Sequence, residues 1–531
     1  MIRARITLAL FLGTALICAR AATPSATALS PGEVRATRAM ETARKIGPGE
    51  LYAFLRSFPK GADLHMHLSG AIYAETFLAE AVKQNLCVDP EALKLAAPPC
   101  SKPLIPANDA VADQPLYDKL IDAMSMRSYV PSSGWSGHDQ FFATFSRWGA
   151  LEKATAGEWL DEVATRAAAQ NEQYLEIMQT PSFGHAAALG YKIGWPAVRD
   201  DNYKTEFAAL REKLINAGLR DEVSIDEKEL ADAEHRRDEI ETCHDDPPLP
   251  PSPEGDHGYG VACAIRIHWL YQILRGYPPQ QVFAQTLLGF EVASADPDVV
   301  GINFVMPEDG RISMQDYHLQ MQMLDYLHSI YPNVRISLHA GELAPGLVPP
   351  AGMSFHIREA IDLGHASRIG HGVDVLYEDD APALLKEMAD KHVMVEINLS
   401  SNAGILGIEG KDHPLTAYRA AHVPWALSTD DEGVSRIDLT HEYVRAADEQ
   451  GLSYLDLKRS ARTSLEHAFL HGESLWQHPD DFTTRKADCP ATVSEHPRLS
   501  GRCSDFLNAN EKAAQEFELE RRFAAFEATI H

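Results

Sequence analysis

Two histidines separated by one residue stand in the segment Asp63-Leu-His-Met-His-Leu-Ser-Gly70. Successive side chains of a strand point to opposite faces, so an extended chain would project His65 and His67 to the same side. Glycine and polar residues flank the segment, which favours a short strand that runs into a loop. Neutral imidazole suits zinc, so the pair could begin a metal site. Because the chain has 23 histidines, a chance pair of surface or core histidines is the alternative.

Four later segments also change from apolar to polar where a strand is expected to end. They are Ser337-Leu-His-Ala-Gly-Glu342, Arg368-Ile-Gly-His-Gly372, Asn398-Leu-Ser-Ser-Asn402 and Leu427-Ser-Thr-Asp-Asp-Glu-Gly433. Small residues beside the polar ones allow these groups to approach a ligand closely. One such ending is ordinary, whereas four in succession after the histidine pair indicate a functional site.

The metal ligands that these segments offer are His65, His67, His339 and Asp430. Three nitrogens and one oxygen are typical of zinc, with a position left for water. Zinc lowers the pKa of that water towards neutrality, which produces a hydroxide nucleophile. A second metal ion often needs a bridging lysine on the fourth strand, and Val299–Val305 has none, so one zinc ion per chain is predicted.

Proton transfer is assigned to two residues that lie close to these ligands in the sequence. Glu342 follows His339 by three residues and is suited to exchange a proton with a substrate. His371 could orient the water and take its proton. Asp431 is adjacent to Asp430, so its side chain must point elsewhere, and we expect it to face the substrate.

Eight short apolar runs are expected to be strands that position these residues. The first carries the histidine pair, and the others are Gln173–Thr180, Val261–His268, Val299–Val305, Arg335–Leu338, Ser367–Ile369, Val393–Ile397 and Pro424–Leu427. Helical patterns separate most of them, for example 313–331, 354–363 and 381–392. Alternating strands and helices predict an α/β fold, a (β/α)₈ TIM barrel with one metal site at the C-terminal ends of its strands.

The chain is acidic, with 76 Asp and Glu against 48 Lys and Arg among 531 residues, a net charge of −28. Such a chain repels phosphate backbones, which argues against nucleic acid as a partner. We expect the barrel to occupy residues 59–470 after an N-terminal helical segment, residues 23–58. Two stretches, about 87–135 and 221–258, have the composition of exposed insertions, and residues 471–531 form a C-terminal extension.

Residues 1–22 have the pattern of a secretory signal peptide. Arg3 and Arg5 precede an apolar run that is short for a membrane span, and Ala19-Arg-Ala21 resembles a cleavage site. Export to a periplasm or to the medium is therefore predicted, with no membrane attachment after cleavage. Six cysteines remain, and an even number in an exported protein suggests disulfides. Among 15 possible connectivities, the pairing of neighbours in the sequence is favoured: Cys87 with Cys100, Cys243 with Cys263, and Cys489 with Cys503.

The ordered motifs around His65, His339, His371 and Asp430 resemble the signature of the adenosine deaminases. Together with the signal peptide, they make the chain similar to the exported, adenosine-deaminase-related growth factor branch. The resemblance covers roughly residues 59–80 and 140–470 without the insertions. It implies a metal-dependent amidohydrolase that removes the 6-amino group of adenosine to give inosine and ammonia. 2′-Deoxyadenosine is the second expected substrate. A purine nucleoside is thus the expected partner, and a homodimer is possible.

The resemblance also assigns roles to individual residues. Glu342 matches the residue that protonates purine N1, and His371 the one that steers hydroxide onto C6. The substrate contacts that it implies are Gly301, whose N–H would meet N3, Asp431 facing N7, His67, Ser69, and the aromatic lid of Phe141 and Phe145. The spacing of Phe141, Phe142, Phe145 and Trp148 alone equally fits the core face of a helix.

Position 69 departs from the family pattern. Many adenosine deaminases have an aspartate there that binds the ribose 5′-hydroxyl, whereas Ser69 keeps a hydroxyl without the charge. Adenine, an N6-substituted adenosine and a phosphorylated adenosine are therefore alternative substrates. Two further alternatives are a single-zinc hydrolase of a cyclic amide and a non-catalytic extracellular binding protein on the same scaffold.

Overall fold

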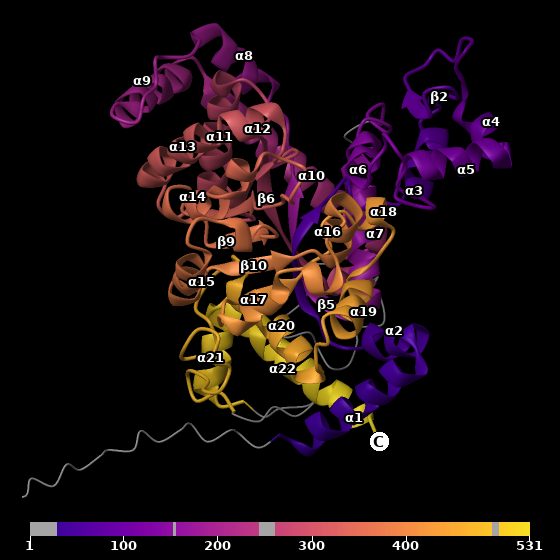
Figure 1. Cartoon of the computed structure of the whole chain (residues 1–531), viewed down its shortest axis with the longest axis vertical. Coiled ribbons are helices and arrows are strands. Elements are labelled where there is room, and N and C mark those ends of the chain that lie inside the picture. Colours follow the sequence, from indigo (N-terminus) through magenta and orange to yellow (C-terminus); the bar gives the residue numbers. More distant parts are fainter. Residues whose placement is uncertain (1–28, 152–154, 244–260, 491–498) are drawn as a thin grey trace, which may run out of the picture.

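The computed structural model describes residues 29–151, 155–243, 261–490 and 499–531. The predicted signal peptide lies outside these residues. No helix in the described part combines the length and the apolar composition that a membrane span requires. Figure 1 shows a central barrel with helices around it, two projections at one end, and the terminal helices at the other.

Eight strands form one parallel sheet in the order of the chain. They are β1 (Gly61–His67), β5 (Glu172–Gln179), β6 (Arg266–Leu274), β7 (Val299–Val305), β8 (Arg335–Ala340), β9 (Arg368–His371), β10 (Met394–Ile397) and β11 (Trp425–Leu427). The sheet closes on itself where the His67 N–H donates to the Asp430 carbonyl (3.2 Å) and the Asp430 N–H to the His65 carbonyl (2.8 Å). The predicted TIM barrel is confirmed.

Helices connect the strands and cover the outside of the barrel (Figure 1). They are α7 (Ala156–Ala169), α8 (Gly184–Ile193), α9 (Tyr203–Asn216), α10 (Val223–Glu241), α11 (Pro279–Ala295), α12 (Arg311–Gln315), α13 (Tyr317–Ile330), α14 (His356–Asp362), α15 (Ala381–Asp390), α16 (Leu399–Leu406), α17 (Leu415–Ala420), α18 (Glu432–Ser435), α19 (Leu439–Glu449) and α20 (Tyr454–His467). Strands covered on both faces read as continuous apolar runs, which is why the runs marked the strands.

One predicted strand is displaced. Residues Val261–Ala264 form a short 3₁₀ helix, and β6 begins only at Arg266 and continues to Leu274. The apolar residues before Arg266 are therefore not strand. The C-terminal half of β6 contains Gln272, whose polar side chain points into the barrel. This polar residue interrupts the apolar run, so the sequence pattern did not indicate that part of the strand.

The terminal segments pack together at the N-terminal end of the barrel. They consist of α1 (Pro31–Ile46), α2 (Pro48–Arg56), α21 (Gly501–Ala509) and α22 (Glu511–Thr529). Ser30 and Glu33 form a capping box that starts α1. Phe58 lies against the rings of Tyr454 and Phe523, with centroids 5.6 and 5.5 Å apart. These contacts bind both termini to α20, and thus to the barrel.

The first expected insertion contains a small sheet of its own. Strands β2 (Cys87–Asp89), β3 (Lys94–Ala96) and β4 (Ile105–Pro106) are antiparallel, and α4 (Ala107–Ala112) and α5 (Gln114–Ala123) follow. With α3 (Ala74–Lys83) they form one of the two projections in Figure 1. The Cys87–Cys100 disulfide lies within this unit.

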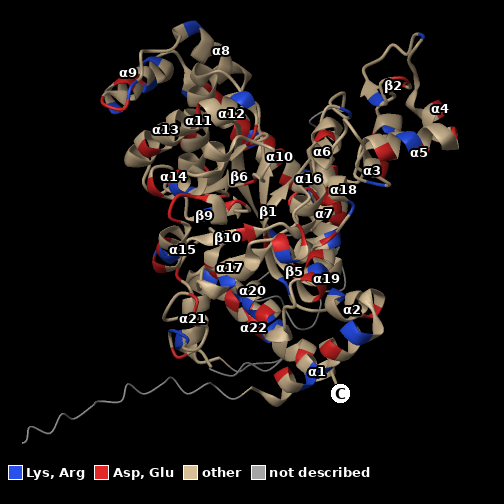
Figure 2. Cartoon of the chain, viewed as in Figure 1, with Lys and Arg blue, Asp and Glu red and all other residues tan. Residues whose placement is uncertain are grey.

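The acidic half of the second expected insertion differs from the prediction of an exposed segment. It forms α10, which buries Leu230 and Ala233, and Glu234 accepts a hydrogen bond from the indole of Trp269 in β6. A helix rich in acidic residues can still cover a barrel when only a narrow face of it is buried. Figure 2 shows that acidic and basic side chains alternate over the outer helices, so the excess negative charge is spread over the molecule.

All three predicted disulfides are confirmed. Cys87 is bonded to Cys100, Cys243 to Cys263 and Cys489 to Cys503. The last of these lies in a separate small core of the C-terminal extension, which also contains Trp476, Leu507 and Phe517.

Candidate metal and catalytic site

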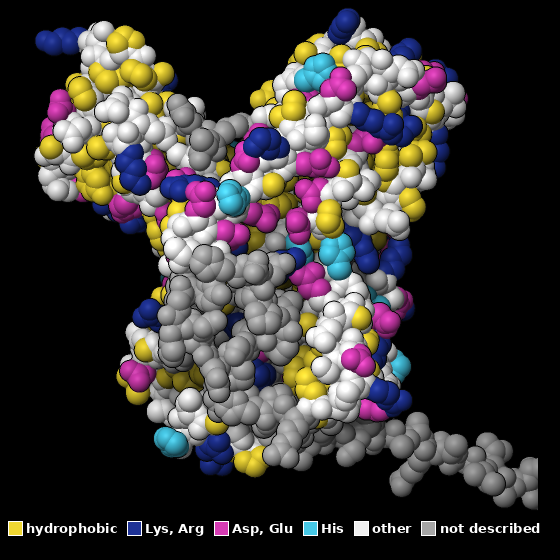
Figure 3. Space-filling model, turned by 180° about the vertical axis from the view of Figure 1, so that it is seen from behind, with side chains coloured by type: hydrophobic (Ala, Val, Ile, Leu, Met, Phe, Trp, Pro, Cys, Tyr) yellow, Lys and Arg dark blue, Asp and Glu magenta, His cyan; other side chains and the backbone are white. Residues whose placement is uncertain are grey.

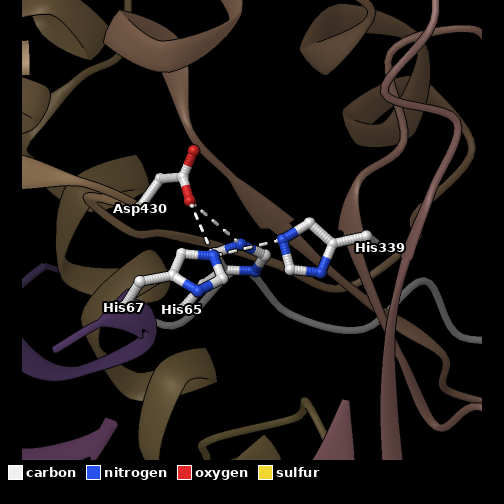
Figure 4. A group of neighbouring side chains, drawn as sticks. All are labelled: His65, His67, His339 and Asp430. Carbon is white, nitrogen blue, oxygen red and sulfur yellow. Dashed lines mark hydrogen bonds and ion pairs between the residues drawn. The ribbon is translucent and has the colours of Figure 1, made fainter. Parts of the chain in front are cut away.

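Four residues from the first, fifth and last strand ends meet inside the barrel (Figure 4). His65 and His67 end β1, His339 lies in β8, and Asp430 follows β11. His67 Nε2 is 3.2 Å from His339 Nε2, and Asp430 Oδ1 is 3.1 Å from His67 Nε2 and 3.4 Å from His65 Nε2. All four side chains are buried. The structure thus brings together the four predicted ligands.

The other ring nitrogen of each histidine has an acceptor on another strand of the barrel. The pairs are His65 Nδ1 with Glu396 Oε2, His67 Nδ1 with Gln272 Oε1, and His339 Nδ1 with Asn303 Oδ1, each at 2.6 Å. An Nδ1–H that donates outwards leaves Nε2 as the electron-pair donor towards the centre, and such partners orient metal ligands in general. His65 Nε2 is buried and has no hydrogen-bond partner among the described residues, as expected of an atom reserved for a metal ion.

Charges around the cluster match this role. Burial raises the pKa of Asp430, but the close contacts with His65 and His67 outweigh it and hold that pKa well below the usual range. Burial, together with the nearby His65 and His67, lowers the pKa of His339 well below its usual value. Three nitrogens, one carboxylate and outward Nδ1 partners fit a zinc-type ion.

Glu342 lies in the turn after β8, and its backbone is held by a second carboxylate. Glu308 accepts hydrogen bonds from the N–H groups of Gly341 (3.0 Å) and Glu342 (2.7 Å) and pairs with His356. Burial raises the pKa of Glu342 well above its usual value, and the negative charges of Asp430 and Glu308 add to this. The raised pKa favours the protonated form of Glu342, which can donate a proton.

His371 ends β9, where its backbone adopts a φ of +70°. Its Nδ1 lies 2.9 Å from the side-chain nitrogen of Asn402 and 3.6 Å from Glu342 Oε1. Burial lowers the pKa of His371 to about 3, so the ring is neutral at neutral pH. The two predicted proton-transfer residues therefore lie side by side.

Asp431 lines the same cavity through a close approach that only glycine allows. A Cβ atom at Gly70 would lie 1.4 Å from Asp431 Oδ1, so the carboxyl group occupies the space that the missing side chain leaves. Oδ1 is buried without a hydrogen-bond partner among the described residues. Burial and the neighbouring Asp430 raise the pKa of Asp431 to about 8. This carboxyl group can thus donate a hydrogen bond to a ligand.

These groups open into a cavity of about 320 Å³. Its polar wall consists of His67, Ser69, Gln272, His339, Glu342, His371, Asp430 and Asp431, and its apolar wall of Phe141, Phe142, Phe145, Leu274, Val305, Met306 and Pro307. The three phenylalanines come from α6 (Gly137–Thr144) and the residue after it. An apolar cleft with a few convergent polar groups is typical of a small-molecule site. Phe141, Phe145 and Ser69 therefore lie where a ligand could touch them.

Gly301 is the predicted site residue that the structure does not bring to the cavity. It is the third residue of β7, and a Cβ there would lie 2.8 Å from the ring of Phe469. The cavity is lined instead by Val305, Met306 and Pro307 at the end of the strand. The assignment of Gly301 came from the family resemblance, since the expected bounds of this strand, Val299–Val305, are those of β7.

Sequence reasoning also missed the residues that orient the ligands. Gln272, Asn303 and Glu396 lie in β6, β7 and β10, next to apolar residues on both sides. Each side chain points to the inside of the barrel, where it binds a histidine from another strand. For Asn303 and Glu396, a lone polar residue in an otherwise apolar strand was the signal that could have identified them.

Comparison with known proteins gives a match over part of the chain. Residues 257–476 match the family model "Adenosine deaminase". The adenosine deaminase of Clostridium perfringens strain 13 is 33% identical over 140 residues, which is 26% of this chain and 39% of that protein. The adenosine deaminase of Escherichia coli O157:H7 is 37% identical over 139 residues, 26% of this chain and 38% of that protein. An adenine deaminase of Rhizobium leguminosarum is 33% identical over 141 residues, 26% and 40% of the two chains.

The alignments with these relatives thus span about two fifths of their length. Among solved structures, the comparison finds the adenine deaminase of Arthrobacter aurescens, with 15% identity and a TM-score of 0.49. The alignment covers 77% of this chain and 94% of that chain. The N6-methyl-AMP deaminase of Arabidopsis thaliana has 20% identity, a TM-score of 0.48 and coverage of 79% and 94%. Residues 257–476 are thus similar to the adenosine deaminase family, and this similarity covers less than half of the chain.

Proposed function

We propose that this protein is a zinc-dependent deaminase that hydrolyses adenosine to inosine and ammonia, with 2′-deoxyadenosine as a second substrate. The observation that carries the proposal is the meeting of His65, His67, His339 and Asp430 with Glu342 and His371 at one cavity. The match of residues 257–476 to the adenosine deaminase family model supports it.

Zinc at the four ligands would supply the Lewis acidity that makes water a nucleophile at neutral pH. The protein's own groups do the rest. Glu342, protonated because it is buried, donates its proton to purine N1 and makes C6 electron-poor. His371 holds the attacking water in line with C6. Asp431, whose pKa is raised to about 8, donates a hydrogen bond to N7 and fixes the ring.

A neutral nucleoside fits the cavity better than a nucleotide does. None of the described residues that line it is Lys or Arg, so a phosphate would find no cation there. Figure 3 shows that acidic side chains, with a few Lys and Arg side chains among them, surround the hollow between the two projections. Ser69 offers a neutral hydroxyl for the sugar. The apolar wall of α6 would cover the purine and exclude water.

Adenine is the second candidate. The Rhizobium leguminosarum relative is an adenine deaminase, and Ser69 lacks the charge that would favour a ribose hydroxyl. N6-substituted and phosphorylated adenosines rank below it, because the apolar wall and the missing cations favour neither. A zinc hydrolase of a cyclic amide would open a ring without releasing ammonia. The binding-protein alternative would retain the metal and show no turnover.

The test is the loss of adenine-band absorbance with adenosine, deoxyadenosine, adenine and AMP, each with an ammonia assay. We expect adenosine to be converted fastest and a chelator to stop the reaction until zinc is restored. If only adenine were converted, the free base would take the place of adenosine as the proposed substrate. No ammonia from any of the four, with one metal ion bound, would refute the deaminase proposal.

A further inference from the structure

A chain of hydrogen bonds runs from a backbone amide to the ring of His371. The Leu415 N–H lies 3.2 Å from His413 Nδ1, and His413 Nε2 lies 3.1 Å from Asn402 Oδ1. The side-chain nitrogen of Asn402 lies 2.9 Å from His371 Nδ1. His413 and Asn402 are buried, and the sequence analysis assigned a role to neither, although Asn402 ends one of the polar segments.

The direction of this chain follows from its first bond. A backbone N–H can only donate, so His413 Nδ1 must be the acceptor and carry no proton. Burial, together with the charge of Arg445, lowers the pKa of His413 to about 4, so its ring is neutral and its single proton is on Nε2. His413 therefore donates to Asn402, and the atom of Asn402 that it meets must be the oxygen.

The second half of the chain follows in the same way. Because the oxygen of Asn402 faces His413, its NH₂ group faces His371 and donates to Nδ1. Asn398 presents its own NH₂ group to the same nitrogen at 3.4 Å. The nearest other group, Glu342 Oε1 at 3.6 Å, is too distant for a hydrogen bond. An imidazole ring whose Nδ1 accepts a hydrogen bond carries its proton on Nε2.

We propose that Asn402 and His413 are positioning residues that fix the tautomer of His371, so that its Nε2–H is presented to the attacking water as a donor. Nε2 is buried and has no partner among the described residues, which leaves this N–H available. His371 then orients the oxygen and does not remove its proton. This inference rests on the proposed deamination, and it decides between the two roles that the sequence left open for this histidine.

The first test determines the tautomer of His371 by spectroscopy and does not depend on turnover. In ¹⁵N spectra of histidine-labelled, metal-loaded protein, assigned by the loss of signals in His371→Gln, Nε2 of His371 should carry the proton and Nδ1 should not. Asn402→Asp places an acceptor at Nδ1 and should move a proton onto that atom. A proton on Nδ1 in the wild type would overturn the proposal, and so would an unchanged Nδ1 signal in Asn402→Asp.

The second test is kinetic and uses two variants of one residue. His413→Phe keeps the ring volume but cannot donate, and we expect kcat to fall by about tenfold with KM nearly unchanged, in the range for groups that orient a catalytic residue. His413→Gln keeps an N–H for Asn402 and should retain most of the turnover. Equal kcat values for the two variants would contradict the proposal.

A control separates this effect from general loss of packing. His268 is also a buried histidine, and its Nδ1 lies 3.0 Å from the Tyr174 hydroxyl, away from the cavity lining. His268→Gln should leave kcat unchanged, and all variants should bind one metal ion per chain. If the wild type deaminated none of the purines, the proposed function would fail, while the ¹⁵N spectra would still decide the tautomer.

Discussion

Individual residues divide into those that hold the metal and those that act on the substrate. His339 belongs to the first group, since its Nε2 faces His67 Nε2 at 3.2 Å, and Glu342 to the second. Each has a different backbone support: β8 carries His339, and Glu308 holds the turn of Glu342. Substitutions at these two positions should therefore have separable effects.

Glu342→Gln should cut kcat by on the order of 10² or more, the scale of general acid catalysis, while the metal content stays at one ion per chain. His339→Ala should lose the metal, because only three of the four ligands remain and one coordination position has no protein ligand. Metal analysis and steady-state kinetics on the same preparations check both. A Glu342→Gln enzyme as fast as the wild type would remove Glu342 from the mechanism.

The ligands could be predicted from the sequence because each lies in a contiguous motif at a strand end. Their partners could not, because Gln272, Asn303 and Glu396 each come from a different strand. Which strand neighbours which histidine depends on barrel register, and a one-residue shift reverses the direction of a side chain.

At the level of elements, α6 is connected to the strand ends by one polar contact. His138 Nε2 lies 2.9 Å from Asp309 Oδ1, three residues after Met306 in the loop that lines the cavity. Phe141 and Phe142 follow on the same helix and face the cavity. The pair therefore links the aromatic cover to the loop after β7.

His138→Ala should raise KM by up to about fivefold with little change in kcat, since a partly exposed pair contributes about 0.2–1 kcal/mol. Asp309→Asn should have a similar effect, and the double variant should be no worse than either single variant. Kinetics of the four proteins measure the coupling. Additive increases in KM would show that the two residues act independently.

A second element contact should make stability depend on pH. Glu442 in α19 is fully buried and accepts a hydrogen bond from the Ser400 N–H of α16 at 3.1 Å. Burial raises the pKa of Glu442 to about 7 in the folded protein. The unfolded chain loses this proton near pH 4.5, so the folded state binds more protons between pH 4.5 and 7. The contribution of Glu442 is thus largest below pH 4.5 and declines as pH rises to 7.

Glu442→Gln cannot titrate, so its free energy of unfolding relative to the wild type should rise by about 1–3 kcal/mol between pH 4.5 and 7.5. Denaturant unfolding at several pH values provides the measurement. A constant difference over this range would mean that Glu442 is ionised in the folded protein throughout.

The element order was predictable because fully buried parallel strands leave apolar runs in the sequence. The boundaries of the strands were less predictable, as β6 shows. Its polar Gln272, which points into the barrel, interrupted the apolar run of the strand, and the apolar residues before Arg266 form a 3₁₀ helix. The acidic α10 was read as exposed because charge dominates its composition, although three of its residues are buried.

For the whole molecule, the disulfides fit an oxidising compartment, and we keep export to a periplasm or the medium as a proposal. They join cysteines 13, 20 and 14 residues apart. Membership of the growth factor branch and a homodimer also stay predictions.

Reduction should lower the melting temperature, because each loop of this length contributes roughly 3 kcal/mol by restricting the unfolded chain. We expect the C-terminal extension to respond first, since Cys489 and Cys503 belong to its separate small core. Melting curves with and without reductant, compared with a Cys489→Ser, Cys503→Ser double variant, measure this. A wild type that melts identically in both conditions would refute the expectation.

The closure of the barrel gives the metal a second consequence. Two backbone hydrogen bonds join β1 to residue 430, and the ligands His65, His67 and Asp430 lie on the two sides of this seam. A bound ion therefore fastens the first strand to the last, across most of the chain. Full affinity can arise only after the last strand has docked, so metal uptake reports a completed barrel. Chelation should accordingly speed amide hydrogen exchange in β1 and around residue 430 before it affects the outer helices.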